Sequence, residues 1–256
     1  MHLPGIHPIP ALLACLLLGS LQAHADGLAD LKAALSRLQG QMPLKAALEI
    51  KTSSRQGDGK EAEDRQGQAS LTLEDSSRGL QLLYGKDILT RAENEQRANS
   101  KDKNSKTPTL YALRALDFTE LRSMTSAATA LAREIEDSTY KGETADTYNG
   151  KPARKLTFEK TIDKLAERDR KYVKDFEGRL TIWIATDGTP LASTMRLNLS
   201  GRAFIVVSFE QQSDEDRSYS VVGDRLVLIR KEEKNRSSGA GERQENKSSM
   251  VLQPLT

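Results

Sequence analysis

The stretch that decides the fold class is residues 179–199, RLTIWIATDGTPLASTMRLNL. Leu180, Ile182 and Ile184 occupy every second position, and this is the period of a half-buried β-strand. The Asp-Gly pair at 187–188 is typical of a hairpin turn, and Leu191 begins a second strand with the same alternation. The stretch therefore predicts two neighbouring antiparallel strands that share one apolar face.

The same period recurs on both sides of this hairpin. Upstream, the Asn-Gly pair at 149–150 predicts another hairpin, and downstream the Gly-Asp pair at 223–224 separates further strands. A charged segment with a helical pattern at 162–178 and a polar Gly/Ser-containing loop at 232–249 are interpreted as insertions. The additional strands predicted in this half of the chain are 139–148, 154–160, 202–211, 219–222, 226–231 and 250–255.

The N-terminal half combines strands with amphipathic helices. We expect a first helix at 27–39, where leucines recur at spacings of three and four residues, and a strand meander after it. Residues 91–107, within a polar insertion at 86–107, have nothing to bury and are interpreted as a mobile loop. The remaining elements predicted here are strands at 44–51, 69–73 and 79–84 and helices at 109–116 and 118–137.

These elements predict an α+β fold with one large, curved antiparallel sheet of about ten strands. Right-handed twist makes a sheet of this size curl, so its apolar face becomes a concave surface. The helix at 118–137, with Asp117 as its N-cap, is expected to cover that surface as a lid. Its apolar face comprises Leu121, Met124, Leu131 and Ile135.

Residues 1–25 are interpreted as a signal peptide. The apolar run at 9–21 is too short to span a membrane, and Ala23-His24-Ala25 supplies the small residues that signal peptidase requires, so cleavage is expected after Ala25. Residues 26–256 then form a single exported, periplasmic domain. The alternative is a lipoprotein anchored through Cys15, which would place the protein on a membrane.

Composition restricts the chemistry. All three histidines and the single cysteine lie in 1–25, so the mature chain lacks Ser-His-Asp and Cys-His catalysis and ordinary zinc sites. The 38 basic and 36 acidic residues nearly balance, and no basic stripe with interleaved aromatics indicates nucleic-acid binding. We therefore expect no enzyme, cofactor or metal. A serine-lysine hydrolase is a weaker alternative, because 138–141 and 100–103 both match S-x-x-K.

The apolar strand faces are the predicted ligand-binding site. They present leucine, isoleucine, valine and phenylalanine at alternate positions, and a groove of this kind gains free energy by burying an acyl chain. The expected partner is a lipid or a lipoprotein's acyl chains, with peripheral membrane contact. The candidate groove residues are Leu48, Ile50, Leu71, Leu73, Leu82, Leu180, Ile182, Ile184, Ile205, Val207 and Phe209.

The chain resembles the LolA-like half-barrels, which include the outer-membrane lipoprotein-sorting proteins LolA and LolB and the N-terminal domain of RseB. The likeness covers the order of elements in most of the mature chain and is carried locally by TYNGKPARKL at 147–156 and LTIWIATDGTPL at 180–191. It implies an open half-barrel of about ten strands, plugged by helices, that carries lipoproteins or lipid. The alternative is a sensor or interaction module with a filled core that binds an envelope protein.

Overall fold

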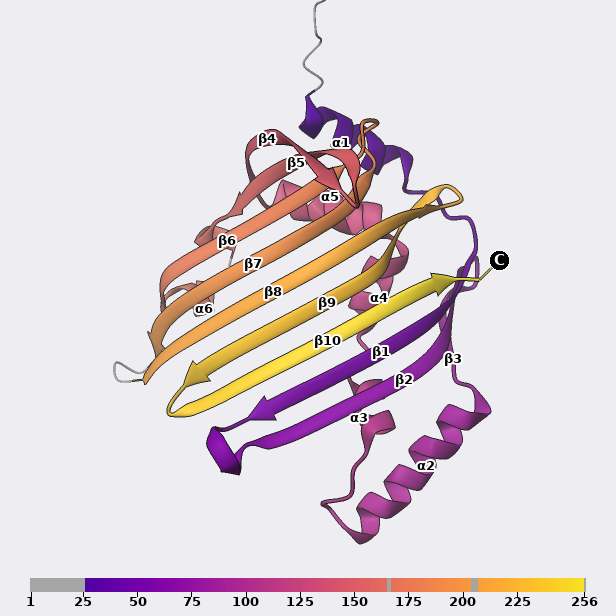
Figure 1. The fold of residues 1–256 in the computed structure, drawn as a ribbon, viewed down its shortest axis with the longest axis vertical. Helices are drawn as coiled ribbons and strands as arrows, with labels where there is room; N and C mark the ends of the chain where they lie inside the picture. The colour runs from indigo at the N-terminus through magenta and orange to yellow at the C-terminus, as the bar shows by residue number, and fades with distance from the viewer. Residues whose placement is uncertain (1–25, 165–166, 204–206, 256) are drawn as a thin grey trace, which may run out of the picture.

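The computed structural model describes residues 26–164, 167–203 and 207–255, and it confirms the α+β class. One ten-stranded antiparallel sheet runs in the order β3-β2-β1-β10-β9-β8-β7-β6-β5-β4 (Figure 1). Within the described residues β3 and β4 each pair on one side only, so the sheet is open. The strands are β1 Leu44–Gln56, β2 Glu63–Ser76, β3 Gly79–Leu83, β4 Thr139–Tyr148, β5 Lys151–Lys160, β6 Val173–Ile184, β7 Pro190–Ala203, β8 Val207–Val222, β9 Arg225–Gly239 and β10 Glu242–Pro254.

The helices lie on one face of this sheet or beside it (Figure 1). We call the helix-bearing face the inner face and the opposite one the outer face. On the inner face, α1, α4 and α5 cover the half of the sheet where β1 begins and β10 ends. The helices are α1 Gly27–Arg37, α2 Lys86–Lys101, α3 Pro108–Arg114, α4 Phe118–Thr125, α5 Ala127–Glu136 and α6 Glu167–Arg170.

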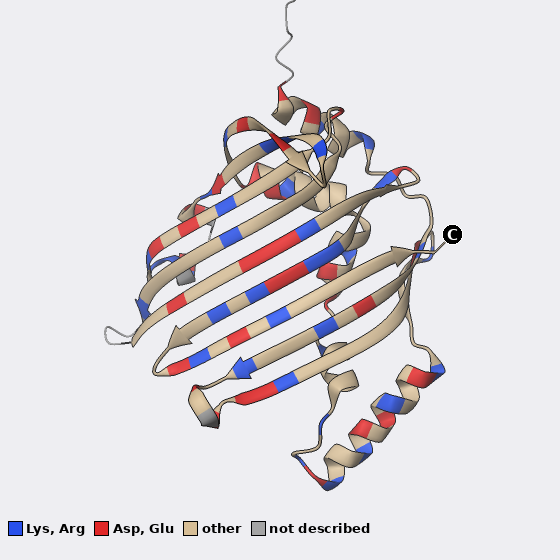
Figure 2. Ribbon diagram, viewed as in Figure 1, with Lys and Arg blue, Asp and Glu red and all other residues tan. Residues whose placement is uncertain are grey.

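The two faces follow from the alternation of side chains along each strand. Inner-face residues such as Leu48 and Ile182 are fully buried in the core, whereas their strand neighbours Lys51 and Arg179 are exposed. Acidic and basic residues are frequent along β8, β9 and β10 (Figure 2), and they pair between strands, as Asp214 does with Arg236 at 3.8 Å. The sheet is therefore apolar on one side only, and only over part of its length.

The predicted polar loop at 232–249 was wrong, because strands replace it. The predicted charged insertion at 162–178 was wrong only at its end, since 162–164 and 167–170 are helical. Residues 232–249 belong to β9 and β10, which meet at a turn where Ala240 and Gly241 have positive φ. β8 likewise runs without a break through 212–218, and β6 already begins at Val173. Backbone pairing and cross-strand ion pairs, including Lys234 with Glu245 at 3.2 Å, hold these polar segments without an apolar core.

The predicted mobile loop at 91–107 is mostly helical, because α2 extends to Lys101. Its residues are good helix formers, and the pairs Asp87–Arg91 and Glu93–Arg97 add support at spacings of four residues. The Glu95 carboxylate also accepts hydrogen bonds from the first amides of α3, at 3.0 and 2.9 Å. Local propensity and this tertiary cap stabilise a helix that buries little apolar surface.

The predicted single helix at 118–137 is two helices. Asp117 caps α4 as expected, since its carboxylate accepts from the Glu120 amide at 3.0 Å. Ser126 then leaves the helical conformation, with φ −128° and ψ 50°, and α5 begins at the next residue. The Thr125 carbonyl accepts a hydrogen bond from Arg225 at 3.4 Å, so a side chain from the sheet contacts the chain at the break.

Gly67 allows α3 to lie against the sheet. A Cβ atom at this position would lie 2.7 Å from the Ala112 amide nitrogen and 2.8 Å from the Pro108 carbonyl oxygen. We expect Gly67→Ala to lower the free energy of unfolding by about 1–3 kcal/mol, because backbone atoms must move to admit the methyl group. Urea denaturation measures the change.

The matched control for this variant is Gln66→Ala, at an exposed outer-face position next to Gly67. It should stay within about 0.5 kcal/mol of the wild type. Equal stability of the two variants would contradict the close approach of α3 to β2.

Candidate functional site

Most of the predicted groove residues lie together on the inner face and are covered. Leu82 is half-buried on the edge strand β3, whereas Val207 and Phe209 are half-buried near the start of β8, outside this core. Ile205 lies outside the described residues. The other groove residues are at most 4% exposed and form one core: Leu48, Ile50, Leu71, Leu73, Leu180, Ile182 and Ile184.

The four predicted lid residues, Leu121, Met124, Leu131 and Ile135, contribute to the same core from α4 and α5. Each is at most 6% exposed. The structure therefore brings the groove and the lid residues together, with the helices in direct contact with the sheet. In this arrangement the helices fill the apolar face.

Charged side chains fasten the two lid helices to the sheet. Lys231 of β9 donates to Glu120 of α4, and it also pairs with Glu233 at 3.1 Å. Arg217 of β8 donates to Glu134 of α5 and to Glu215 on its own strand. These six residues, which we call the fastening network, lie on the inner face at the margin of the apolar core.

The pKa values in this network reflect close pairing. Burial alone would lower the pKa of Lys231, but Glu215 and Glu120 raise it above its usual value. Burial would raise the pKa of Glu233, but Lys231 and a hydrogen bond from Asn235 hold it below its usual value. Both side chains therefore stay charged near neutral pH, and the network is electrostatically stable there.

A cavity of about 440 Å³ lies beside the fastening network, where α4 and α5 meet β8 and β9. Leu131 and Leu228 provide apolar lining, and Glu134, Arg217 and Lys231 provide charged lining. Next to Arg217 in β8, the hydroxyl of Tyr219 forms a buried hydrogen bond of 2.8 Å with that of Ser193. The inner face thus has a gap between lid and sheet with an apolar side and a charged side.

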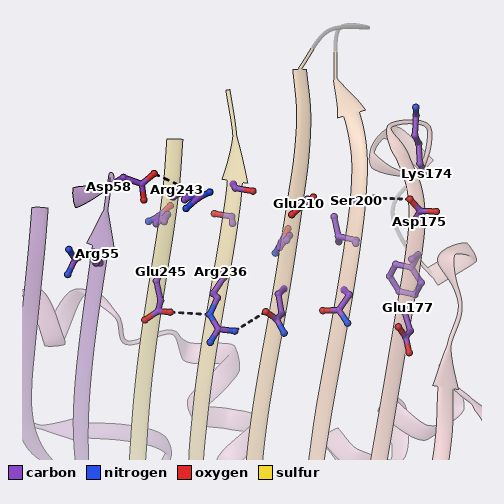
Figure 3. A pocket seen from close by; sticks show the side chains of 18 of the residues that line it. Arg55, Asp58, Lys174, Asp175, Glu177, Ser200, Glu210, Arg236, Arg243 and Glu245 are labelled. Carbon is purple, nitrogen blue, oxygen red and sulfur yellow. Dashed lines mark hydrogen bonds and ion pairs between the residues drawn. The ribbon is translucent and has the colours of Figure 1, made fainter. Parts of the chain in front are cut away.

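A second hollow, of about 960 Å³, lies among outer-face side chains at the opposite end of the strands (Figure 3). Arginines predominate on the side formed by β1, β9 and β10, and carboxylates on the side formed by β6 and β8. Arg236 pairs with Glu245 at 3.1 Å, and Arg243 with Asp58 at 3.7 Å. Sequence reasoning missed this hollow, although the alternating charges of 207–249 were its visible signal.

The S-x-x-K motifs do not assemble a nucleophile with its base. The Ser138 hydroxyl donates to the Glu134 carbonyl at 2.7 Å, while Lys141 pairs with Glu159 at 2.7 Å. The Ser100 hydroxyl donates to the Gln96 carbonyl within α2. Among the described residues there is also no group of three or more acidic, histidine or cysteine side chains that could hold a metal ion.

Comparison of the chain with protein-family models, with curated proteins and with solved structures found no match. In the part of the chain that the structure describes, no helix is long and apolar enough to cross a membrane.

Arg217 is the single arginine among the six residues of the fastening network, and its side chain is 18% exposed. We expect Arg217→Met to lower the free energy of unfolding by about 3 kcal/mol, because it removes the cationic partner of the partly buried Glu134 and leaves Glu215 with Lys231 alone, at 3.6 Å. Urea denaturation at neutral pH tests this. Adding Glu134→Gln should recover part of the loss.

The exposed pair Arg179–Glu177 provides the control. Arg179→Met should cost less than about 1 kcal/mol, since surface pairs contribute little. A loss in Arg217→Met no larger than that control would show that the network does not hold the lid.

Stability should fall in acid through Glu233, whose folded-state pKa is depressed. A depressed carboxylate contributes stability above its unfolded pKa of about 4.3, and the contribution is lost as pH falls through the folded value. Between pH 5.5 and 3.5, Glu233→Gln should therefore lose less stability than the wild type in urea titrations. Exposed Glu242→Gln serves as control, and parallel curves for all three proteins would contradict the prediction.

Proposed function

We propose that this protein is an exported, non-enzymatic binding protein that holds an apolar ligand between the inner face and the lid formed by α4 and α5. The ligand is a lipid or the acyl chains of a lipoprotein. The observation that carries the proposal is the manner of closure: two short helices cover the apolar strands, and charged side chains fasten their margins beside a cavity.

The energetics support exchange of lid contacts for ligand contacts. Burial of an acyl chain gains about 0.8 kcal/mol per methylene, so a chain of about twelve carbons gains roughly 10 kcal/mol. This gain is comparable with the free energy that two short helices contribute through their apolar contacts. The break at Ser126 lets α4 and α5 move separately. When the lid opens, the charged side chains at its margin become hydrated, so loss of their ion pairs costs little free energy.

The open sheet, covered on one face by helices, is the arrangement expected of a LolA-like half-barrel, and we propose that fold type here. We further propose a periplasmic location on the basis of residues 1–25, which lie outside the described residues. Tethering through Cys15 is the alternative, and it would bring the inner face close to membrane lipid.

Weakening the fastening network should increase ligand uptake. In Glu120→Gln with Glu134→Gln, the open lid becomes more populated, so apparent affinity for a fluorescent twelve-carbon acyl probe should improve several-fold. Stopped-flow fluorescence and equilibrium titration measure it. Glu136→Gln, at an exposed position on α5, is the matched control.

Failure of the wild type and of the double variant to bind the probe would reject the apolar-ligand proposal. Mass spectrometry of lipids extracted with the protein from its native envelope gives an independent readout. Co-purification of a defined lipid supports the proposal.

The second candidate is an interaction module with a filled core. Full burial of the inner-face residues favours it, as does the outer-face hollow with its arginine and carboxylate sides. A photo-cross-linker at Glu210, which lines that hollow, should capture an envelope protein in cells if this function holds. A cross-linker at exposed Glu136 is the control, and capture at both positions or neither counts against the candidate.

A further inference from the structure

A cavity of about 640 Å³ lies where β2 ends beside the break between α4 and α5. It is separate from the cavity at the fastening network, and it adjoins the opposite side of the lid. Its polar lining includes Asp75, Ser76, Arg122, Ser126, Thr129 and Arg225. This combination places two guanidinium groups next to several hydroxyls.

Arg225, which lines this cavity, has a hydrogen-bond donor without an acceptor. The residue is 5% exposed, and its Nη1 donates to Asp75 at 2.7 Å and to the Thr125 carbonyl at 3.4 Å. Its Nε is buried and has no hydrogen-bond partner. A buried guanidinium N–H without an acceptor is costly, so the site is one acceptor short.

Arg122 brings a second guanidinium to the same carboxylate. Its Nη1 lies 3.1 Å from both oxygens of Asp75, and its side chain is about half exposed. Two guanidinium groups and one carboxylate leave one positive charge at the cavity. Asp75 therefore orients both arginines without neutralising them.

The N-terminus of α5 adds donors to the same cavity. Ser126 is its N-cap, but the serine side chain makes no capping hydrogen bond, and the first turn holds no acidic residue. Ser126, Ala128 and Thr129 all line the cavity. Free amides at a helix N-terminus carry partial positive charge and favour an anion.

We propose that this cavity binds a phosphate-class oxyanion between Arg122, Arg225 and the first turn of α5. The planar guanidinium presents donors at a spacing that matches the oxygens of a phosphate group. Such a group is either inorganic phosphate or the head group of an acidic amphiphile, whose chain would meet Leu80 and the exposed ring of Phe118 at the cavity. The site does not depend on the apolar-ligand proposal, because inorganic phosphate has no chain.

Ser126→Asp separates binding from folding. A carboxylate at the N-cap occupies the free amides and repels an anion, while it stabilises the helix. Isothermal titration with inorganic phosphate, at ionic strength matched with chloride, should show binding to the wild type and at least tenfold weaker binding to Ser126→Asp. Urea denaturation should show unchanged or increased stability of the variant.

The matched control is Ser126→Asn, which caps the helix without charge and should bind phosphate within about threefold of the wild type. Absence of phosphate binding to the wild type, or equal binding to Ser126→Asp, overturns the proposal. Dodecyl phosphate that binds over tenfold more tightly than phosphate identifies a lipid head group as the source, whereas equal affinity identifies the free ion. Dodecyl maltoside reports on the apolar site alone, so its failure to bind rejects only that function.

Discussion

One constraint governs this structure: a large antiparallel sheet with one apolar face must cover that face. An apolar strand surface costs about 25 cal/mol for each square ångström left exposed to water, and the core side chains of β1, β2 and β5–β10 form one continuous surface. The chain supplies the cover from α1, which precedes β1, and from the helices between β3 and β4. The lid helices are therefore required for stability, whether or not they also move.

The helices are short, and their own propensity is not enough to keep them folded. Their position depends on side chains that the sheet projects toward them. Arg217 and Lys231 contact α5 and α4 from one side, and Arg225 contacts the break between them from another. Three cations from two adjacent strands thus position both lid helices, and the acidic partners are distributed on these helices and the sheet.

Apolar periodicity was sufficient to predict the class of fold and the membership of most of the core, and the Asn-Gly turn at 149–150 placed the strand 139–148. It failed where polar strands are held by pairing alone, as in 232–249, and where α2 depends on Glu95 capping a neighbouring helix.

The position of Lys231 is a further feature that apolar periodicity does not predict. A register shift between Ser218 and Tyr219 in the pairing of β8 with β9 leaves Ile229 without a partner and reverses the alternation after Leu228. Lys231 consequently faces the lid, on the same side as Leu228, and no count of alternate residues places it there.

The pairing of β1 with β10 determines when the sheet can be completed. Ala46 lies opposite Pro254, so β1 finds one of its two neighbours about 200 residues later in the chain. Until that neighbour arrives, β1–β3 and β4–β9 are two separate sheets, and β1 and β9 are each an additional unpaired edge. Contacts of such sequence separation make folding slow. Completion of this sheet therefore has to wait for β10, and removal of that strand alone would separate β1–β3 from β4–β9.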